Sequence, residues 1–338
     1  MKPIVTAKKL SIGYCGQGFE NYLVLKDLNF EIFQGDMICL MGHNGCGKTT
    51  LLRTLAGLID SISGKIEIDD KNIDVYTAKE LAQIVSVVLT ERLDLSGLKV
   101  RDVVALGRYP YTNIWGKLGP SDLQAIDRAI SLVEMNDIQH KQFSMLSDGQ
   151  KQKALLARAL AQDTAIIYFD EPTTYLDIPG RMEILKVMKR IALEKNKAII
   201  FSSHDWHLVL SMTNWIWIIN EAGKLVRGVP EDLILNGEFE KSFMRENFVF
   251  DRGSGSFIEA VVMDKNIMLI GDDDIAVYWT RHALMKNGIG VINNSDNVSE
   301  AINIIIRENS IKWVVRVNGT EQDFNSIESL LVYLKSWP

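Results

Sequence analysis

The stretch with the clearest chemical character is a glycine-rich segment that begins at residue 42. It matches the pattern G-x-x-x-x-G-K-[ST] and contains, in order, Gly42, His43, Asn44, Gly45, Cys46, Gly47, Lys48 and Thr49, with Thr50 next. Glycines let successive backbone N–H groups converge on phosphate oxygens, and a following helix adds its positive N-terminal end. The pattern places Lys48 at the β- and γ-phosphates of a nucleotide and Thr49 on Mg²⁺. His43 and Cys46 fill variable positions, so we assign their side chains no chemistry.

Two acidic residues follow the apolar residues 165–169. These are Asp170 and Glu171. Asp170 suits a Mg²⁺ ion held through water, and Glu171 is placed to polarise an attacking water as general base. A pair of acids after a strand more often begins a solvated loop, but beside a phosphate loop we favour the catalytic interpretation.

A second segment with the character of an anion-binding site precedes a predicted long helix. It consists of Leu146, Ser147, Asp148, Gly149 and Gln150. The first N–H groups of a helix have no partner within the helix, so they can bind an anion. One chain alone does not explain why it would need two such helix ends.

The elements that must position these residues alternate between strand and helix, which predicts an α/β fold. Short apolar runs predict strands at residues 37–41, 84–89, 165–169, 198–203 and 215–219. Several of these runs are almost continuously apolar, as in strands covered on both faces. Helical patterns occupy residues 48–56, 121–134 with Ser121 as N-cap, 148–161 and 181–194.

Composition limits the class of protein. The 338 residues suffice for two domains, and 47% hydrophobic with 24% charged residues is typical of a globular chain. The net charge of −6 disfavours nucleic acid as a partner. The three cysteines fit a reducing compartment. We expect no secretory leader in the first residues. We also expect no membrane-spanning segment, because the longest uncharged stretch, residues 206–220, is shorter than the roughly 20 apolar residues that span a bilayer.

Taken together, five motifs in this order resemble the nucleotide-binding subunit of an ABC transporter. They are the phosphate loop, residues 146–150, Asp170-Glu171, Leu176-Asp177 and His204, and the resemblance extends over about residues 1–247. It implies a P-loop ABC ATPase cassette with a helical signature subdomain, which binds ATP and Mg²⁺. It also implies a head-to-tail dimer, in which Leu146 to Gln150 of one copy complete the ATP site of the other.

The resemblance assigns roles to further residues. Tyr14 would stack against adenine, although a half-buried strand tyrosine is a competing interpretation. His204 would contact the γ-phosphate and help Glu171 position water, and Asp177 would lie at the dimer interface. Where the family carries a glutamine that senses Mg²⁺, this chain has Thr90-Glu91; Thr90 is the closer match in position, and Glu91 is an alternative ligand.

The segment 106–111 reads Leu-Gly-Arg-Tyr-Pro-Tyr and resembles ATPases of importers for ferric siderophores, haem and cobalamin. The competing interpretation is a loop after a helix, which Pro110 would end. The resemblance implies a peripheral ATPase on the inner face of the cell membrane. It would dock through residues 90–116 onto two transmembrane permease subunits, with a substrate-binding protein acting indirectly. A soluble non-transport ABC ATPase and an exporter subunit are the alternatives.

A second unit is expected after residue 250, so we divide the chain into a cassette at residues 1–250 and a small α/β accessory domain at residues 251–338. Residues 251–256 read as a linker. Strands are predicted at 267–270, 290–292 and 312–317, and helices at 275–286, 299–307 and 326–334. The segment 267–276 resembles the start of a dinucleotide-binding unit, but the acids at 272–274 would repel a pyrophosphate. These acids instead favour the start of a helix. A regulatory or dimer-contacting role is our working hypothesis for this domain.

Overall fold

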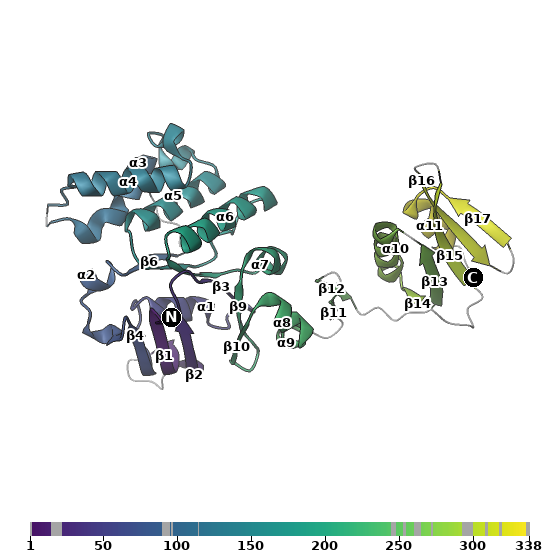
Figure 1. The fold of residues 1–338 in the computed structure, drawn as a ribbon, viewed down its shortest axis with the longest axis horizontal. Helices are drawn as coiled ribbons and strands as arrows, with labels where there is room; N and C mark the ends of the chain where they lie inside the picture. The colour runs from purple at the N-terminus through teal and green to yellow at the C-terminus, as the bar shows by residue number, and fades with distance from the viewer. Residues whose placement is uncertain are drawn as a thin grey trace. The chain divides into compact units, whose positions relative to one another are not determined.

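The computed structural model describes residues 2–14, 22–89, 95, 97–113, 115–244, 248–252, 255–259, 265–271, 273–292, 300–307, 310–317 and 320–335. The chain forms two compact units, Met1–Phe243 and Met244–Pro338, each with its own hydrophobic core (Figure 1). Thr90 and Glu91 lie outside the described residues.

The first unit contains two sheets. The four-stranded sheet has the order β2-β1-β4-β5 and consists of β1 (Val5–Tyr14), β2 (Tyr22–Ile32), β4 (Ser63–Ile68) and β5 (Lys71–Asn72). The six-stranded sheet has the order β10-β9-β3-β8-β7-β6 and consists of β3 (Met37–Gly42), β6 (Val85–Val88), β7 (Ile166–Phe169), β8 (Ala198–Ser202), β9 (Trp215–Ile219) and β10 (Leu225–Gly228). All pairs in the six-stranded sheet are parallel except β9 with β10.

The five strands predicted from apolar runs are confirmed as β3, β6, β7, β8 and β9. Every residue of β3, β7 and β8 is buried, which explains their continuous hydrophobicity. Strands β1, β2 and β4 were not predicted from the sequence. Their exposed positions interrupt the apolar pattern, as expected for antiparallel strands with one covered face.

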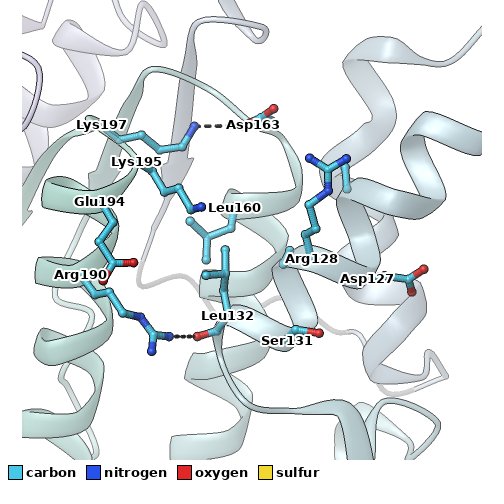
Figure 2. Close-up of a pocket in the computed structure, with 12 residues that line it drawn as sticks. Asp127, Arg128, Ser131, Leu132, Leu160, Asp163, Arg190, Glu194, Lys195 and Lys197 are labelled. Carbon is cyan, nitrogen blue, oxygen red and sulfur yellow. Dashed lines mark hydrogen bonds and ion pairs between the residues drawn. The ribbon is translucent and has the colours of Figure 1, made fainter.

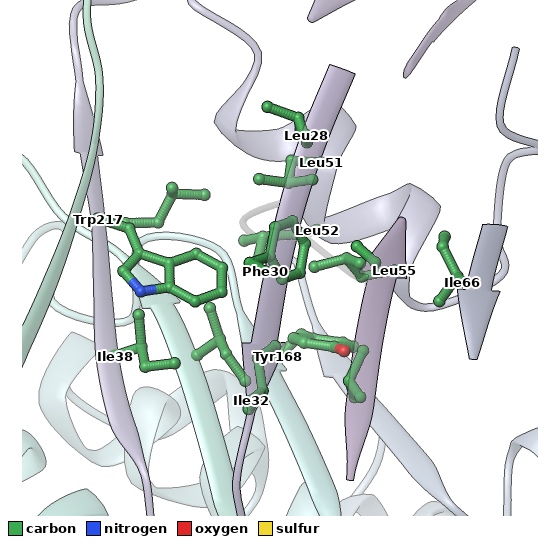
Figure 3. Close-up of a cluster of buried hydrophobic side chains, with 14 of the residues drawn as sticks. Leu28, Phe30, Ile32, Ile38, Leu51, Leu52, Leu55, Ile66, Tyr168 and Trp217 are labelled. Atoms are coloured by element: carbon green, nitrogen blue, oxygen red, sulfur yellow. The ribbon is translucent and has the colours of Figure 1, made fainter. Parts of the chain in front are cut away.

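Helix α1 (Lys48–Leu55) packs in the core that joins the two sheets. Figure 3 shows its Leu51, Leu52 and Leu55 beside Phe30 of β2 (Figure 3). The ring of Phe30 lies 4.7 Å from that of Trp217 in β9, a tilted aromatic contact. Burial of this face fixes α1, and therefore fixes the loop that leads into it.

The helical part of the first unit packs on the side of the parallel sheet away from β1, β2 and β4 (Figure 1). It consists of α3 (Val100–Ala105), η2 (Leu106–Tyr111), α4 (Pro120–Leu132), η3 (Asn136–Ile138), η4 (Phe143–Met145) and α5 (Asp148–Ala161). The predicted N-cap at Ser121 is wrong. Helix α4 begins one residue earlier because Pro120 suits the first helical position, and Gly119 is the N-cap.

Other elements of the first unit complete the α/β pattern. They are η1 (Ile73–Val75), α2 (Ala78–Leu81), α6 (Ile178–Glu194), α7 (Trp206–Met212), α8 (Pro230–Leu235) and α9 (Glu238–Phe243). Across the described residues of the whole chain, no helix has both the length and the apolar character needed to cross a membrane.

Within its described residues, the second unit contains a two-stranded sheet, a five-stranded sheet of order β14-β13-β15-β16-β17, and two helices. Its elements are β11 (Phe248–Asp251), β12 (Ser256–Glu259), β13 (Lys265–Gly271), α10 (Asp274–Lys286), β14 (Ile289–Ile292), β15 (Glu300–Arg307), β16 (Ser310–Val317), β17 (Thr320–Phe324) and α11 (Ile327–Lys335). Asp251 and Ser256 do not belong to the linker expected at residues 251–256, because they pair with each other at the ends of β11 and β12. Our boundary after residue 250 therefore falls inside β11.

The predicted helix at residues 299–307 is wrong. This segment forms β15, which pairs in parallel with β13 and antiparallel with β16. Ile302, Ile305 and Ile306 have helical spacing, but Ile302, Ile304 and Ile306 also alternate as in a strand, and β-branched residues favour strands. The acidic helix start is confirmed, since Asp273 caps α10 by accepting from Ala276 N at 2.8 Å.

The Gly-Arg pair of η2 is part of the packing between η2, α4 and α5. A Cβ at Gly107 would lie 2.1 Å from the carbonyl oxygen of Arg158, so only glycine allows this approach. Arg108 Nε donates to Asp122 Oδ1 at 2.9 Å, and both side chains are more than nine-tenths buried. Arg108 also donates to Ala161 O at 2.8 Å, so it ties η2 to both α4 and the end of α5.

This ion pair predicts a pH-dependent stability. The Gly119 N–H and then Arg108 hold the pKa of Asp122 below its usual value of 3.8. A lowered folded-state pKa contributes stability above the usual value, and the contribution is lost as pH falls through the folded-state pKa. We expect Asp122→Ala to lower the free energy of unfolding at pH 7 by about 3 kcal/mol, since it leaves a buried guanidinium unpaired.

Urea denaturation of the full chain at a series of pH values measures this effect. The difference between the wild type and Asp122→Ala should shrink below about pH 4. Asp127→Ala is the control, because Asp127 pairs with Arg101 on the surface and should cost less than about 1 kcal/mol. A difference that stays constant while the pH falls would contradict the assignment.

Candidate functional site

The glycine-rich loop connects β3 to α1 and requires glycine at two positions. Gly47 is the N-cap of α1 with φ +106°, and a Cβ there would lie 2.5 Å from Val24 Cγ1. At Gly42, with φ +149°, a Cβ would lie 2.6 Å from Cys46 Sγ. The loop therefore closes tightly against its own base, which brings its backbone toward the N-terminus of α1.

The side chain of Lys48 bends back over this loop. Its Nζ donates to Gly42 O at 2.9 Å and to His43 O at 3.1 Å. The residue is only 6% exposed, so its charge is concentrated at the loop rather than in solvent. His43 is exposed, whereas Cys46 is buried in the core and burial raises the pKa of its thiol.

Asp170 is held by hydroxyl groups from two other segments. Thr49 Oγ1, on the first turn of α1, donates to Asp170 Oδ2 at 2.8 Å. Ser202 Oγ, at the end of β8, donates to Asp170 Oδ1 at 2.7 Å and accepts from Glu171 N at 2.8 Å. Parallel pairing of Phe169 with Phe201 places Asp170 and Ser202 side by side.

Sequence reasoning missed Ser202, which is fully buried and contacts both acidic residues. A polar residue at the end of an otherwise apolar strand, two positions before His204, was the available signal. Its position follows from strand register, which the spacing of residues along the chain does not show.

Glu171 and His204 meet at the same edge of the sheet. His204 Nε2 lies 2.6 Å from Glu171 Oε1, and Thr174 Oγ1 donates to Glu171 Oε2 at 2.9 Å. Glu171 adopts the left-handed conformation, with φ +51°, which is uncommon for a residue other than glycine. Both carboxylate oxygens are therefore oriented, and the chain turns sharply away from β7 at this residue.

Tyr14 ends β1 next to the first turn of α1. Its hydroxyl and Thr50 Oγ1 are 3.0 Å apart, and about half of its surface is exposed. An aromatic ring with one open face beside a phosphate loop can stack on a base. The structure thus places Tyr14 beside the phosphate loop through Thr50, and it places Asp170 there through Thr49.

Residues 146–150 form the capped start of α5. Leu146 is buried, and Ser147 and Asp148 are exposed. Ser147 Oγ accepts from Gln150 N at 3.3 Å, and Gln150 Oε1 accepts from Ser147 N at 3.2 Å, a capping box. In the described part of the chain, no hydrogen bond or ion pair joins this segment to the phosphate loop.

Asp177 is the N-cap of α6. Its Oδ1 accepts from Gly180 N at 3.0 Å, so one carboxylate oxygen serves its own helix. Asp177 itself is exposed. This exposure leaves it available to a second chain, as a residue at a dimer interface must be.

The oxygen pair formed by Thr49 and Asp170 suits Mg²⁺. This ion prefers one or two protein oxygens and completes its shell with water and substrate phosphates. The chemistry of these two groups therefore fits the ion. Among the described residues, no group of three or more histidine, cysteine, aspartate or glutamate side chains forms a metal cluster.

A separate pocket of about 720 Å³ lies between α4, α5 and α6 (Figure 2). Lys197 and Asp163 pair across it at 3.0 Å, and Arg190 donates to Leu132 O at the end of α4. The residues that line it include no member of the site above. We interpret these contacts as bonds that hold the helical part to the sheet.

A phosphate loop between β3 and α1, with two acids at the end of β7, defines a P-loop nucleotide-binding protein. Residues 25–174 match the family model described as ABC transporter. Residues 264–335 match the model described as Iron ABC transporter C-terminal domain. An uncharacterized ABC transporter ATP-binding protein of Methanocaldococcus jannaschii is 36% identical over 231 residues, 68% of this chain and 78% of that protein. The chain belongs to the ATP-binding proteins of the ABC transporter family.

Two further comparisons are consistent with this membership. The petrobactin import ATP-binding protein of Bacillus subtilis is 33% identical over 240 residues, 71% of this chain and 92% of that protein. A solved structure described as a metal-chelate type ABC transporter in an inward-facing conformation is 27% identical, with a TM-score of 0.62. That match covers 76% of this chain and 96% of the other. The predicted ABC cassette fold and its ATPase class are confirmed.

Ser202→Ala tests the hydroxyl that joins the two acids. We expect ATP hydrolysis to fall about tenfold, because Asp170 and Glu171 lose a shared anchor. The free energy of unfolding should fall by about 2 kcal/mol, because hydrogen bonds to charged groups contribute about that much to stability.

The matched control is Ser211→Ala, because the exposed hydroxyl of Ser211 donates to Leu208 O within α7. Steady-state phosphate release and urea denaturation of both variants give the measurements. Wild-type hydrolysis by Ser202→Ala would show that strand pairing alone positions the acids.

Proposed function

We propose that this chain is the ATP-hydrolysing subunit that energises import of an iron complex through separate transmembrane subunits. The observation that carries the enzymatic part is the contact of Glu171 with His204, next to Asp170, which accepts a hydrogen bond from Thr49 of the phosphate loop. The choice of iron complexes draws on the match at residues 264–335 and on the petrobactin import relative. Ferric siderophore and haem are the leading ligands, with cobalamin as an alternative.

Binding of ATP would use groups that the fold has already oriented. Backbone N–H groups of residues 42–49 would hold the phosphates, Lys48 would exchange its carbonyl partners for phosphate oxygens, and Tyr14 would stack on adenine. Thr49 and Asp170 would hold Mg²⁺, which neutralises phosphate charge when bound. The negative net charge of the chain does not oppose this, since the contacts are local.

Hydrolysis would proceed by attack of water on the γ-phosphorus. A new bond forms between the water oxygen and phosphorus, the bond to the β,γ-bridging oxygen breaks, and ADP leaves with its electron pair. Glu171 accepts the water proton as general base. His204, held against Glu171 Oε1, orients that carboxylate and reaches toward the γ-phosphate.

A second copy of the chain would complete each site. Two anion-binding helix ends in one chain make sense if α5 serves the ATP of a partner in a head-to-tail dimer. Exposure of Ser147, Asp148 and Asp177 supports this arrangement. Closure of such a dimer around ATP and reopening after hydrolysis is a population shift driven by differential affinity.

Docking onto two permease subunits is proposed at residues 90–116, on the inner face of the membrane, with a substrate-binding protein acting indirectly. Tyr109 and Trp115 are 76% and 85% exposed, and aromatic residues are enriched in protein–protein interfaces. Arg108 lies 3.8 Å from the ring centroid of Tyr111, which fixes the base of this surface.

Glu171→Gln tests the catalytic assignment. Glutamine keeps the shape of the side chain but cannot accept a proton at neutral pH, so hydrolysis should fall by at least about 100-fold. ATP should still bind, and the variant should accumulate as an ATP-bound dimer. Phosphate release and size-exclusion chromatography with Mg·ATP measure the two effects.

Glu183→Gln is the matched control, because the Glu183 side chain is 51% exposed on α6, where it pairs with Lys153. It should hydrolyse ATP at the wild-type rate. Brisk turnover by Glu171→Gln would remove Glu171 as the base.

Transport is tested in the cell of origin. A deletion strain should lose uptake of a labelled ferric chelate or haem and regain it with the wild-type gene, but not with the Glu171→Gln gene. The full chain should co-purify with a polytopic membrane protein. Unchanged uptake, with no such partner, would favour a soluble ABC ATPase.

A further inference from the structure

Arg181 lies on the first turn of α6 and connects two loops that leave the parallel sheet at the site. Its Nε donates to Leu176 O at 2.8 Å, and its Nη1 donates to Asp205 Oδ2 at 2.7 Å. Leu176 belongs to the loop after β7, and Asp205 belongs to the loop after β8. The rigid, planar fork of a guanidinium directs a separate N–H group at each acceptor, whereas the flexible ammonium of a lysine does not fix their relative positions.

Asp205 is itself held on several sides. Its Oδ1 accepts from Leu208 N at 3.3 Å and caps α7, while its N–H donates to Ser203 Oγ at 3.1 Å. The carboxylate is therefore shared between Arg181 and the start of α7. Because Asp205 directly follows His204, the backbone that carries the imidazole is restrained by this carboxylate.

The bridge is also partly shielded from water. The side chains of Arg181 and Asp205 are 35% and 22% exposed. Charge-assisted hydrogen bonds with good geometry are stronger and more directional than neutral ones. A contact of this kind can set the relative position of two loops more firmly than an open surface pair.

We infer that Arg181 is a positioning residue for hydrolysis, which holds the His204 imidazole against Glu171 by tying Leu176 to Asp205. The inference rests on the proposed function, since it gives Arg181 a part in the reaction at Glu171. The contacts form a chain from Leu176 through Arg181 and Asp205 to His204. The last contact, His204 Nε2 to Glu171 Oε1 at 2.6 Å, is the one that the bridge sets.

The Arg181 bridge includes the carbonyl oxygen of Leu176, the residue that directly precedes Asp177. If Asp177 faces a second copy of the chain, a change at the dimer interface would pass to His204 through one guanidinium. A merely structural role would differ from this, because it would stabilise α6 without changing the reaction in the folded protein.

Arg181→Ala in the full chain separates these roles. We expect kcat with Mg·ATP to fall about tenfold, while KM for ATP stays within about twofold, because the phosphate loop keeps its contacts. Lys186→Ala, an exposed residue on the same helix, should change neither value. Arg181→Lys should recover part of kcat, since one of the two hydrogen bonds can form again.

A double variant tests whether Arg181 acts through His204. Adding Arg181→Ala to His204→Ala should lower kcat no further, because coupled residues are not additive. An equal fall in both backgrounds would overturn the inference. So would a lower unfolding midpoint for Arg181→Ala with unchanged kcat per folded molecule.

Failure of the inference can be told from failure of the proposed function. If Glu171→Gln hydrolyses ATP at the wild-type rate, the catalytic assignment fails, and the role of Arg181 fails with it. If Glu171→Gln is inactive and Arg181→Ala keeps the wild-type kcat, only the inference fails.

Discussion

The carboxylate of Asp170 is the point on which the rest of the site depends. One oxygen accepts from Thr49 of the phosphate-loop helix and the other from Ser202 of β8. Three segments that are far apart in the chain therefore meet at one side chain. If this carboxylate were lost, the side-chain hydrogen bond that connects the phosphate-loop helix to the segment of Glu171, our proposed general base, would be lost with it.

Burial of the parallel sheet makes this geometry rigid. β3 and β7 both pair with β8, and each of the three strands is buried along its whole length. Parallel neighbours end at the same edge, so loops after β3, β7 and β8 leave the sheet together. Packing of α1 against both sheets then fixes the height of the phosphate loop above that edge.

Many residues of the candidate site were identified from sequence because their types and spacing suggest a chemical role. The phosphate loop, the acids after an apolar strand and His204 each have a type and spacing that indicates their role. Ser202 was not found, since its contacts arise from the register of two strands. The pairing of Arg181 with Asp205 was missed for the same reason, because it depends on how the start of α6 lies against the loop after β8.

Two errors in the predicted fold have different physical causes. At residues 299–307, helical spacing and β-branched composition disagreed, and pairing with two neighbouring strands decided the outcome. At Ser121, a residue type that often caps helices does not do so, because Pro120 occupies the first helical position. In the first case pairing with neighbouring strands determined the structure, and in the second a local preference of the adjacent residue did.

The capping box at the start of α5 has a consequence for any partner that binds there. The hydroxyl oxygen of Ser147 already accepts a hydrogen bond from its own helix, but a hydroxyl has one hydrogen left to donate. A phosphate group could receive that hydrogen while the cap stays intact. Recognition at this helix end would then need no local unfolding, so assembly and separation of two copies could repeat many times at little conformational cost.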